Sequence, residues 1–283
     1  MSAIRNIVLI LLLNIALASQ AQESGALARI QEVGVLRVAL YKHNYPYSYL
    51  QENQMRGIDV DLARALSERL GLGLSTMNLT ASDESMADDL RNAVWKGHYL
   101  GGGTADVMLH VPVDKAFAEE NDQVIIFAPY YREEIVIAHD PTRLSDINSL
   151  LVFMQEPIGV ELATFADTFL SMAERGRLVS KLRHYPTFRQ ACQALQQGDV
   201  SAVLAQRAQL EACLKDERGR FQLRTVPTPV KLLSWPVGMA VKEDAMDLKN
   251  ALSEALSALQ DDGRLAAIFQ NHGVTYVAPP AID

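Results

Sequence analysis

Segments with the residue pattern of a β-strand alternate with segments that have the pattern of an amphipathic helix along most of this chain. The first strand pattern covers 35–40, where β-forming residues dominate. The apolar residues that then recur at every fourth position are Ile58, Leu62, Leu66 and Leu70. This spacing predicts a helix with one buried face, and Gly71 is typical of a helix end. Further strand patterns over 74–79 and 106–110 enclose a helix predicted over 83–96, and this order predicts an open α/β sheet.

The same alternation is repeated in the second half of the chain. Two more strands, predicted over 123–127 and 134–138, lead into a new series. In that series strands are expected at 157–160, 181–185, 201–204 and 237–241, and helices at 164–174, 188–196, 207–214, 245–260 and 264–271. No Gly/Ser-rich linker separates the two series, so we expect ordered strands rather than a flexible tether to join two lobes. A length of 283 residues suits two such units better than one.

The charge balance and composition exclude several classes of protein. The chain has 26 Lys and Arg residues against 34 Asp and Glu residues, a net charge of −8. Because nucleic-acid binding relies on cationic side chains that meet phosphates, this balance argues against it. Hydrophobic residues make up 49% and charged residues 21%, which is ordinary globular usage and excludes disordered, collagen-like and coiled-coil structures.

The first residues have the features of an export signal. Arg5 precedes an apolar run that only Asn14 interrupts. Ser19 and Ala21 then supply small residues at the −3 and −1 positions of a cleavage site. We expect a secretory signal peptide over 1–21. The alternative is a membrane anchor, but a spanning helix needs roughly 20 apolar residues and this run is shorter. A soluble protein exported to the periplasm, with no membrane insertion after cleavage, is therefore expected.

Cys192 and Cys213 are the two cysteines of the chain. In an oxidising compartment a disulfide between them is expected, and two buried free thiols are the alternative. No His or Asn motif accompanies either residue, so we do not interpret them as nucleophiles. Two cysteines also exclude a Cys₄ zinc site.

A series of short motifs runs through nearly the whole chain after residue 21, and the most specific is Gly57-Ile-Asp-Val-Asp-Leu-Ala63. The others lie at 36–40, 45–49, 106–107, 127–131, 158–160, 198–203, 237–241 and 259–263. In order and spacing they resemble the family 3 periplasmic solute-binding proteins, the receptor type of ABC importers. The resemblance implies a two-lobed periplasmic-binding-protein fold (type II), in which each lobe is an open α/β sheet and two strands form the hinge.

The same resemblance implies the division of the chain and its function. The first lobe would comprise 25–134 and 234–283, and the second 135–233. A small polar solute would bind in the cleft between them and be enclosed by hinge bending, without catalysis, cofactor or metal, for delivery to an ABC permease. The position agrees with the rule that ligands of α/β sheets bind at the carboxyl ends of strands.

The sequence departs from the amino-acid binders of this family at two places. Those proteins hold the ligand carboxylate with an Arg after the strand that corresponds to 106–110, whereas this chain has Lys115 as its only basic residue there. A Lys does not grip a carboxylate bidentately. The Asp that usually meets the ligand ammonium is replaced by Gln206. We therefore expect a ligand other than a standard α-amino acid.

Three further segments resemble a subgroup of the family. They are Val111-Pro112, Pro129-Tyr-Tyr-Arg132 and Gly273-Val-Thr275. The subgroup contains the periplasmic partners encoded beside quinoprotein (PQQ-dependent) alcohol dehydrogenases. This similarity implies an accessory role with such a dehydrogenase or its cofactor as the alternative to solute uptake.

The candidate ligand-binding residues are Tyr45, Tyr47, His110, Pro112, Lys115, Thr164 and Gln206. The two tyrosines would stack on a ligand, or alternate ones would pack in the core. His110 would stand at a strand end facing the cleft, or be a satisfied histidine at the lobe boundary. Lys115 is equally interpreted as a solvated surface charge. Thr164 would offer its hydroxyl to an anion, or serve only as a helix N-cap.

Other chemistry has weaker support in the sequence. The Gly101-Gly-Gly103 segment follows a predicted helix and precedes a predicted strand, which is the reverse of the order in a phosphate-binding loop. We therefore interpret it, together with His98 and Tyr99, as an insertion that lengthens the rim of the first lobe. No two histidines have the spacing of metal ligands, and no Gly-x-Ser-x-Gly motif is present. A dehydratase-type enzyme on the same fold is a further alternative, for which His110 with Glu161 is the best available acid–base pair.

Overall fold

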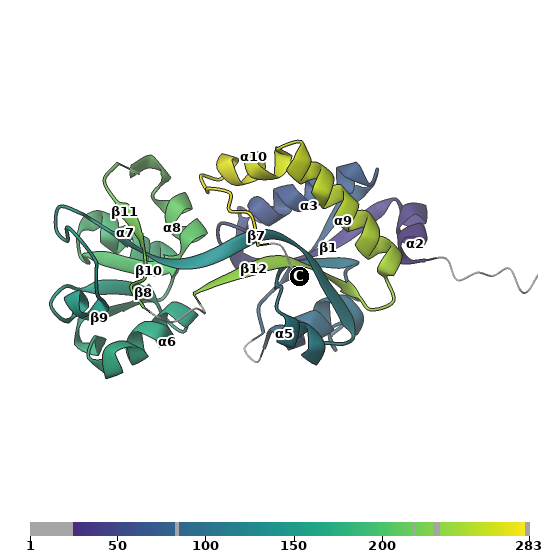
Figure 1. Ribbon diagram of the computed structural model, residues 1–283. Coiled ribbons are helices and arrows are strands. Elements are labelled where there is room, and N and C mark those ends of the chain that lie inside the picture. The colour runs from purple at the N-terminus through teal and green to yellow at the C-terminus, as the bar shows by residue number, and fades with distance from the viewer. Residues whose placement is uncertain (1–24, 83–84, 218, 229–232, 281–283) are drawn as a thin grey trace, which may run out of the picture.

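The computed structural model describes residues 25–82, 85–217, 219–228 and 233–280, and the expected signal peptide over 1–21 lies outside these ranges. The chain has the two-lobed α/β architecture of a type II periplasmic-binding-protein fold (Figure 1). Within the described ranges, no helix combines the length and the apolar character needed to cross a membrane.

The sheet of the first lobe has the strand order β5-β1-β6-β12-β7. Its strands are β1 (Val35–Tyr41), β5 (Gly73–Leu79), β6 (Val107–Pro112), β12 (Ser234–Lys242) and the first part of β7 (Val124–His139). Both β5 and β6 pair in parallel with β1, whereas β12 is antiparallel to its neighbours β6 and β7. The helices are α2 (Ala26–Val33), α3 (Ile58–Arg69), α4 (Met86–Leu90), α5 (Lys115–Glu120), α9 (Met246–Asp261) and α10 (Arg264–Asn271).

The second lobe continues from the other end of β7. Its remaining strands are β8 (Ile158–Glu161), β9 (Leu182–Tyr185), β10 (Ala202–Gln206) and β11 (Gln222–Thr225). Strands β10 and β11 are antiparallel to β7, and the order β10-β8-β9 is parallel. The helices are α6 (Phe165–Met172), α7 (Phe188–Gln197) and α8 (Arg207–Cys213).

The apolar stripe that predicted α3 is buried as expected. Ile58, Leu62 and Leu66 have at most 1% of their surface exposed, because they face the sheet of the first lobe and helix α9. Gly71 follows the helix with φ of 71°, the left-handed conformation that favours glycine. In the second lobe, α7 ends in the same way at Gly198, whose φ is 81°.

The hinge differs from the expectation of two separate strands over 123–127 and 134–138. A single strand, β7, runs through both ranges and passes from one lobe to the other (Figure 1). The strand stays continuous because it pairs with β12 on both sides of an irregularity at Ala128, whose φ is 48°: Phe127 lies opposite Met239 and Tyr131 opposite Val237. Between Glu134 and Ile135, β7 exchanges its neighbour β12 for β10, and we place the boundary of the lobes there.

Several elements were not predicted from the sequence. They are α2, α5, β11 and a small sheet of β2 (His43–Asn44), β3 (Ser48–Gln51) and β4 (Gln54–Arg56). The helix expected over 83–96 is divided, since α4 continues into a π-helical turn over Arg91–Trp95. These elements are short, and their formation depends on contacts with the rest of the fold.

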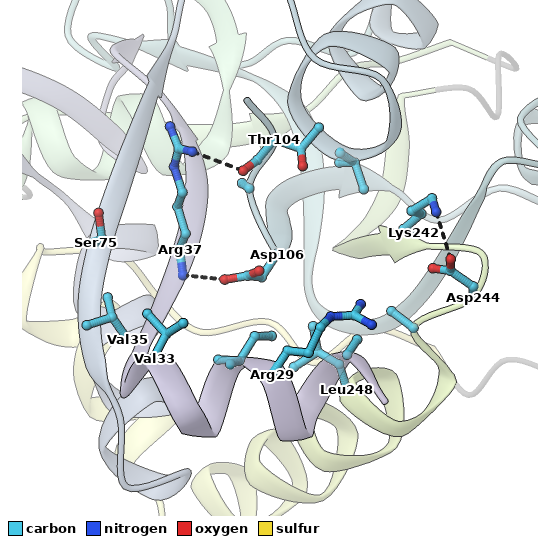
Figure 2. Close-up of a pocket in the computed structure, with 15 residues that line it drawn as sticks. Arg29, Val33, Val35, Arg37, Ser75, Thr104, Asp106, Lys242, Asp244 and Leu248 are labelled. Atoms are coloured by element: carbon cyan, nitrogen blue, oxygen red, sulfur yellow. Dashed lines mark hydrogen bonds and ion pairs between the residues drawn. The ribbon is translucent and has the colours of Figure 1, made fainter. Parts of the chain in front are cut away.

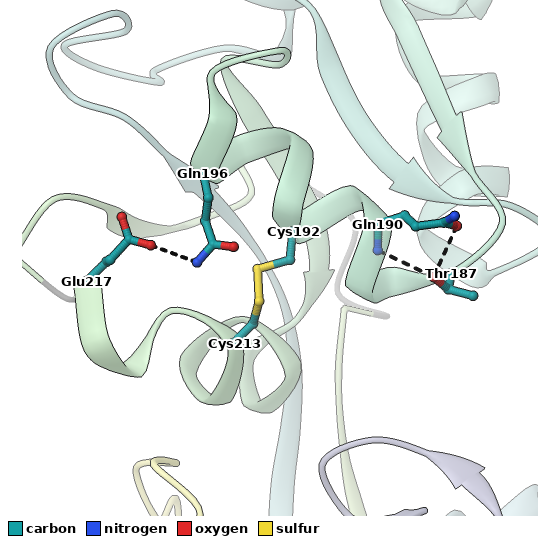
Figure 3. Close-up of a disulfide and its surroundings, with 6 residues drawn as sticks. All are labelled: Thr187, Gln190, Cys192, Gln196, Cys213 and Glu217. Carbon is teal, nitrogen blue, oxygen red and sulfur yellow. Dashed lines mark hydrogen bonds between the residues drawn. A yellow bond between two sulfur atoms is a disulfide. The ribbon is translucent and has the colours of Figure 1, made fainter. Parts of the chain in front are cut away.

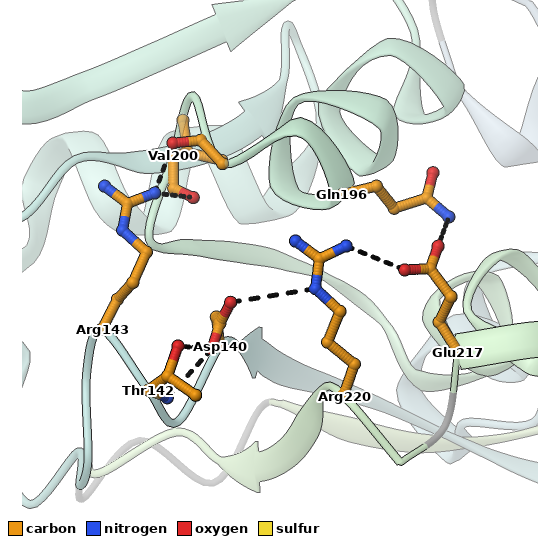
Figure 4. Close-up of polar contacts among 8 residues, drawn as sticks. Asp140, Thr142, Arg143, Gln196, Val200, Glu217 and Arg220 are labelled. Carbon is orange, nitrogen blue, oxygen red and sulfur yellow. Dashed lines mark hydrogen bonds and ion pairs between the residues drawn. The ribbon is translucent and has the colours of Figure 1, made fainter.

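The expected disulfide is confirmed. Cys192 of α7 and Cys213 at the end of α8 form it, with their Cα atoms 6.8 Å apart (Figure 3). Beside it Gln196 donates a hydrogen bond of 2.7 Å to the Glu217 carboxylate. Figure 4 shows that Arg220 continues this series of contacts, at 2.9 Å from Glu217 and 3.9 Å from Asp140. The disulfide and these contacts fix α7 and α8 relative to each other.

Candidate functional site

Two adjoining cavities lie between the lobes, and together we call them the front compartment. The first, of about 490 Å³, is lined by Tyr41, His43, Asn44, Ala81, Ser82, Ser85, Met86, Asp89, His110, Pro112, Gln206, Trp235 and Val237. The second, of about 290 Å³, is lined by His43, Asn44, Ile135, Glu161, Thr164, Phe165, Ala166, Leu204, Ala205, Gln206, Gln209 and Trp235. They share His43, Asn44, Gln206 and Trp235, so they form one continuous space with walls from both lobes.

His110 is held in a defined orientation at the edge of this space. It lies on β6 with φ of 62°, a left-handed conformation that is unusual for a residue other than glycine. Its backbone N–H donates to the Tyr130 hydroxyl at 3.0 Å, and that hydroxyl donates to the Asp59 carboxylate at 2.8 Å. The Nδ1 atom of His110 lies 3.2 Å from the same carboxylate. Backbone strain at a site of this kind persists only when the surroundings fix it, and here Asp59 and Tyr130 do so.

Behind His110 lies a second buried pair. The Tyr47 ring centroid is 4.2 Å from that of His110, and the Tyr47 hydroxyl donates a hydrogen bond to Glu133 of β7. Burial raises the pKa of the Glu133 carboxyl, since the charged form loses its hydration, and the bond from Tyr47 offsets part of this effect. Tyr47 therefore connects the histidine to the hinge strand.

The front compartment contains two carboxyl groups from different lobes. Asp89 accepts a hydrogen bond of 2.7 Å from the Tyr41 hydroxyl, and burial raises the pKa of Asp89. Burial also raises the pKa of Glu161, which accepts a hydrogen bond from the Phe188 backbone. Among the described residues that line the front compartment, none is Arg or Lys. The compartment thus offers hydrogen-bonding groups but no permanent positive charge.

The structure brings four of the candidate residues of the sequence analysis together. His110, Pro112, Thr164 and Gln206 all line the front compartment. Thr164 acts as the N-cap of α6, because its hydroxyl accepts from the Asp167 N–H at 3.2 Å and donates to a backbone carbonyl. Its proton and one of its lone pairs are thus already engaged within the protein.

The other three candidates lie elsewhere. Tyr47 is fully buried behind His110 and has no surface in the compartment. The side chain of Lys115 is 90% exposed at the start of α5, with Glu119 at 3.8 Å, and it lines none of the cavities between the lobes. Tyr45 lines a separate cavity on the other side of His43.

Sequence reasoning missed several residues of the front compartment. His43 and Asn44 follow the end of β1, so the rule that ligands bind at strand ends was a signal for them. Trp235 stands on β12 and packs against the cores of both lobes. Nothing local in the sequence marks Trp235 or Asp89 as a cleft residue.

The third cavity between the lobes, the rear compartment, has a volume of about 660 Å³. It is lined by Lys42, His43, Tyr45, Tyr49, Leu50, Glu161, Thr187, Phe188, Arg189, Gln193, Gln196, Gln209, Ala212, Cys213 and Lys215. It shares His43, Glu161 and Gln209 with the front compartment, so the two compartments adjoin along these residues. The rings of Tyr45 and Tyr49 are 5.1 Å apart, and the Arg189 guanidinium lies 5.9 Å from the Tyr45 ring centroid.

A further cavity of about 580 Å³ lies at the opposite edge of the first lobe (Figure 2). There the Arg37 N–H donates to Asp106 at 2.8 Å, and the Arg37 guanidinium donates to the carbonyls of Thr104 and Gly102. The Gly101–Gly103 insertion thus folds onto Arg37 near the amino ends of β1 and β6, away from the cleft. Within the described ranges, no group of three His, Cys, Asp or Glu side chains is arranged to hold a metal ion.

Comparisons with known proteins agree with this architecture. Residues 36–94 match the family described as bacterial extracellular solute-binding proteins, family 3. An ancestral cationic amino acid solute-binding protein is 18% identical, with 87% of this chain and 99% of that chain covered and a TM-score of 0.68. No curated protein sequence matches the chain.

Two solved bacterial structures give the same result. A polar amino acid ABC uptake transporter substrate-binding protein from Streptococcus thermophilus is 16% identical, with 92% of this chain and 93% of that chain covered and a TM-score of 0.68. An amino acid ABC transporter substrate-binding protein from Streptococcus pneumoniae, bound to L-arginine, is 20% identical, with coverage of 89% and 100% and a TM-score of 0.61. At these identities the likeness concerns the fold.

Proposed function

We propose that this chain, a relative of the family 3 extracellular solute-binding proteins, captures a small polar solute without a carboxylate group in its front compartment. The lobes enclose the solute by bending where β7 exchanges its partner strand, between Glu134 and Ile135. The protein acts after export to the periplasm and delivers its solute to an ABC permease.

The observation that carries this proposal is the charge of the front compartment. A site that selects a carboxylate places an Arg fork or a similar cation against it. Here the described lining contains no Arg or Lys, and it includes two histidines and two carboxyl groups: His43, His110, Asp89 and Glu161. Desolvating a carboxylate next to Asp89 and Glu161 would be unfavourable, whereas a neutral or cationic polar solute finds acceptors there.

His110 is the residue that we assign to orienting the solute. Its Nδ1 atom is buried at 3.2 Å from the Asp59 carboxylate and its ring packs on Tyr47, so we assign Nε2 as the nitrogen that meets a ligand. Because both partners are buried, the ring loses little conformational freedom on binding. Gln206 and Asn44 contribute neutral amides from the two lobes, and Trp235 contributes an aromatic face.

We do not assign a catalytic role to this site. His110 and Glu161 line different parts of the front compartment, and the carboxylate beside His110 is that of the buried Asp59. A binding protein returns its ligand unchanged, so mass spectrometry of recovered ligand tests this point. A chemically altered ligand at stoichiometric yield would contradict it.

The proposal is tested by a thermal-shift screen of the protein without its signal peptide. The panel pairs carboxylate-free polyols, amides and amines with amino acids of similar size. We expect a member of the first group to raise Tm and the amino acids to leave it unchanged, since a ligand stabilises the state that it binds. His110→Ala should abolish the shift, whereas His98→Ala, a histidine at the opposite edge of the first lobe, should retain it. A larger shift with amino acids than with all carboxylate-free solutes would overturn the proposal.

A second candidate function is the accessory role with a quinoprotein alcohol dehydrogenase. The observation in its favour is that one segment of that subgroup resemblance, Pro129–Arg132, bonds to the chain just beyond another, Gly273–Thr275. The Arg132 N–H donates to the Val277 carbonyl at 3.0 Å, and the Thr275 N–H donates to the Glu211 carboxylate. A stable complex with the dehydrogenase in native mass spectrometry, formed without a small-molecule adduct, would favour this role over solute delivery.

A further inference from the structure

The rear compartment carries the positive charge that the front compartment lacks. Its basic residues are Lys42, Arg189 and Lys215. Among the described residues, none of these three has a carboxylate oxygen within 4.0 Å, although Arg64, Arg69, Arg207 and Arg220 elsewhere in the chain all form such ion pairs. In a chain with a net charge of −8, three cations that form no ion pair with a described residue surround one cavity and form a local site for an anion.

The carboxyl group in this compartment does not neutralise these cations. Glu161 lies on the wall shared with the front compartment, where its carboxylate accepts a hydrogen bond from the Phe188 backbone. Burial raises its pKa, so its charged form is disfavoured relative to a solvated glutamate. With Glu161 ionised the compartment has three positive charges and one negative charge.

Two aromatic rings form the opposite wall. Tyr45 lies in the turn between β2 and β3 and Tyr49 lies on β3, with their ring centroids 5.1 Å apart and their planes tilted by 60°. Arg189 of the second lobe lies over Tyr45, so the cation and the aromatic face come from different lobes and meet across the cavity. A planar ring placed here contacts the tyrosines while a carboxylate on that ring reaches the guanidinium.

The second-lobe wall is fixed by the contacts shown in Figures 3 and 4. The disulfide ties α7, which carries Arg189, to the end of α8, which is followed by Lys215. Gln196 and Arg220 both bond to Glu217, and Thr187 caps α7 by accepting from the Gln190 N–H. Arg189 and Lys215 are therefore carried on backbone that these contacts hold in place, which lowers the entropic cost of binding, whereas Lys42 comes from the first lobe.

We propose that the rear compartment is a binding site for an aromatic carboxylate, with the ring against Tyr45 and Tyr49 and the carboxylate at Arg189. This site is separate from the front compartment and takes a ligand of the opposite charge class. It does not depend on the identity of the solute in the front compartment, because Lys42, Arg189 and Lys215 do not line that compartment, although the two compartments share His43, Glu161 and Gln209.

The test uses the full chain without its signal peptide, with benzoate as the probe in isothermal titration calorimetry. Benzamide keeps the ring and removes the charge, and acetate keeps the charge and removes the ring. We expect benzoate to bind about tenfold more tightly than either. Arg189→Gln should weaken benzoate binding by about tenfold or more, and Arg183→Gln, an exposed arginine outside the cavity lining, should leave it unchanged.

Two outcomes overturn the inference. The first is benzoate affinity that is equal in the wild type and in Arg189→Gln, with unchanged Tm and circular dichroism showing that the variant is folded. The second is loss of benzoate binding in His110→Ala but not in Arg189→Gln, which would place the probe in the front compartment. Failure to find a front-compartment solute leaves these results unaffected, so the two proposals fail separately.

Discussion

The front and rear compartments lie between the same two lobes and share His43, Glu161 and Gln209, yet they differ in charge. The front compartment has no Arg or Lys among its described lining residues, whereas the rear compartment has three cations and a pair of tyrosines. The fold supplies the space in both cases. The ligand class follows from the side chains that enter that space, which is why a shared fold does not transfer a ligand from one protein to another.

The two compartments also differ in the contacts that hold their side chains in place. In the front compartment, His110 is held from behind by buried partners on its own lobe, Asp59 and Tyr47. In the rear compartment, the backbone that carries Arg189 and Lys215 is held by a disulfide and by contacts between helices. The two sites should therefore respond differently to the same perturbation.

The largest expected effect comes from removing the disulfide. A double variant, Cys192→Ser with Cys213→Ser, should lower the free energy of unfolding by about 3 kcal/mol, because the unfolded chain regains conformational freedom. Benzoate binding in the rear compartment should weaken, while binding of the front solute at a temperature below the new Tm should persist. Urea unfolding measures the change in stability, and calorimetry measures binding in each compartment. Equal losses in both compartments would show that they are not fixed independently.

A cation introduced into the front compartment should remove the charge difference. Gln206→Arg places a guanidinium among the residues that line both front cavities. We expect its affinity for acetate to rise by about 2 kcal/mol, since hydrogen bonds to charged groups contribute roughly 1.5–3 kcal/mol. Gln206→Lys is the matched control and should gain less, because a lysine cannot bind a carboxylate bidentately. No gain in either variant would mean that Gln206 does not reach the ligand position.

Thr164→Ala distinguishes a structural residue from a ligand-binding one. Its hydroxyl caps α6, so the substitution should cost about 1 kcal/mol of stability. Binding of the front solute should change little, because the hydroxyl already bonds within the protein. Thr168→Ala, one turn further along the exposed side of α6, is the control and should cost less. If the free energy of solute binding falls by more than the free energy of unfolding, the Thr164 hydroxyl contacts the solute.

The smallest effect concerns Glu161 on the shared wall. Glu161→Gln removes the one negative charge from the rear compartment and should strengthen benzoate binding by about two- to fivefold. Gln193→Glu adds a charge to the same lining and should weaken binding. Calorimetry at pH 7 compares the two variants with the wild type. A benzoate affinity that neither change moves would contradict an electrostatic origin of binding.

The same residue predicts a pH dependence of stability. Burial raises the pKa of Glu161 above its value in the unfolded chain, so its protonated form is favoured in the folded state. The protonated Glu161 carboxyl therefore makes its full contribution to the free energy of unfolding at pH values below the unfolded pKa of about 4.3. This contribution is lost as the pH rises through the pKa of the folded state. Urea unfolding of the wild type between pH 4 and 8 should therefore show a fall in stability that is smaller in Glu161→Gln.

Much of the fold was predictable because its signals are local. The stripe of Leu62 and Leu66 on α3 and the alternation in β1 follow from the period at which side chains face a core. The single strand β7 was predicted as two, because its middle segment contains Pro129 and reads locally as a break. Pairing with β12, far away in sequence, keeps the strand continuous across that segment, since Phe127 lies opposite Met239 and Tyr131 opposite Val237.

The sequence by itself determined the α/β class and the two series of elements, since periodicity and strand order are encoded in neighbouring residues. It predicted a strand that ends at His110, whereas β6 continues to Pro112. Only the tertiary structure decided which side chains share a cavity. It places Lys115 in solvent and Arg189 against Tyr45, and it adds Trp235 to the cleft. The physical reason is that a compartment is formed by residues from both lobes, whose approach depends on the packing of the whole chain around the hinge.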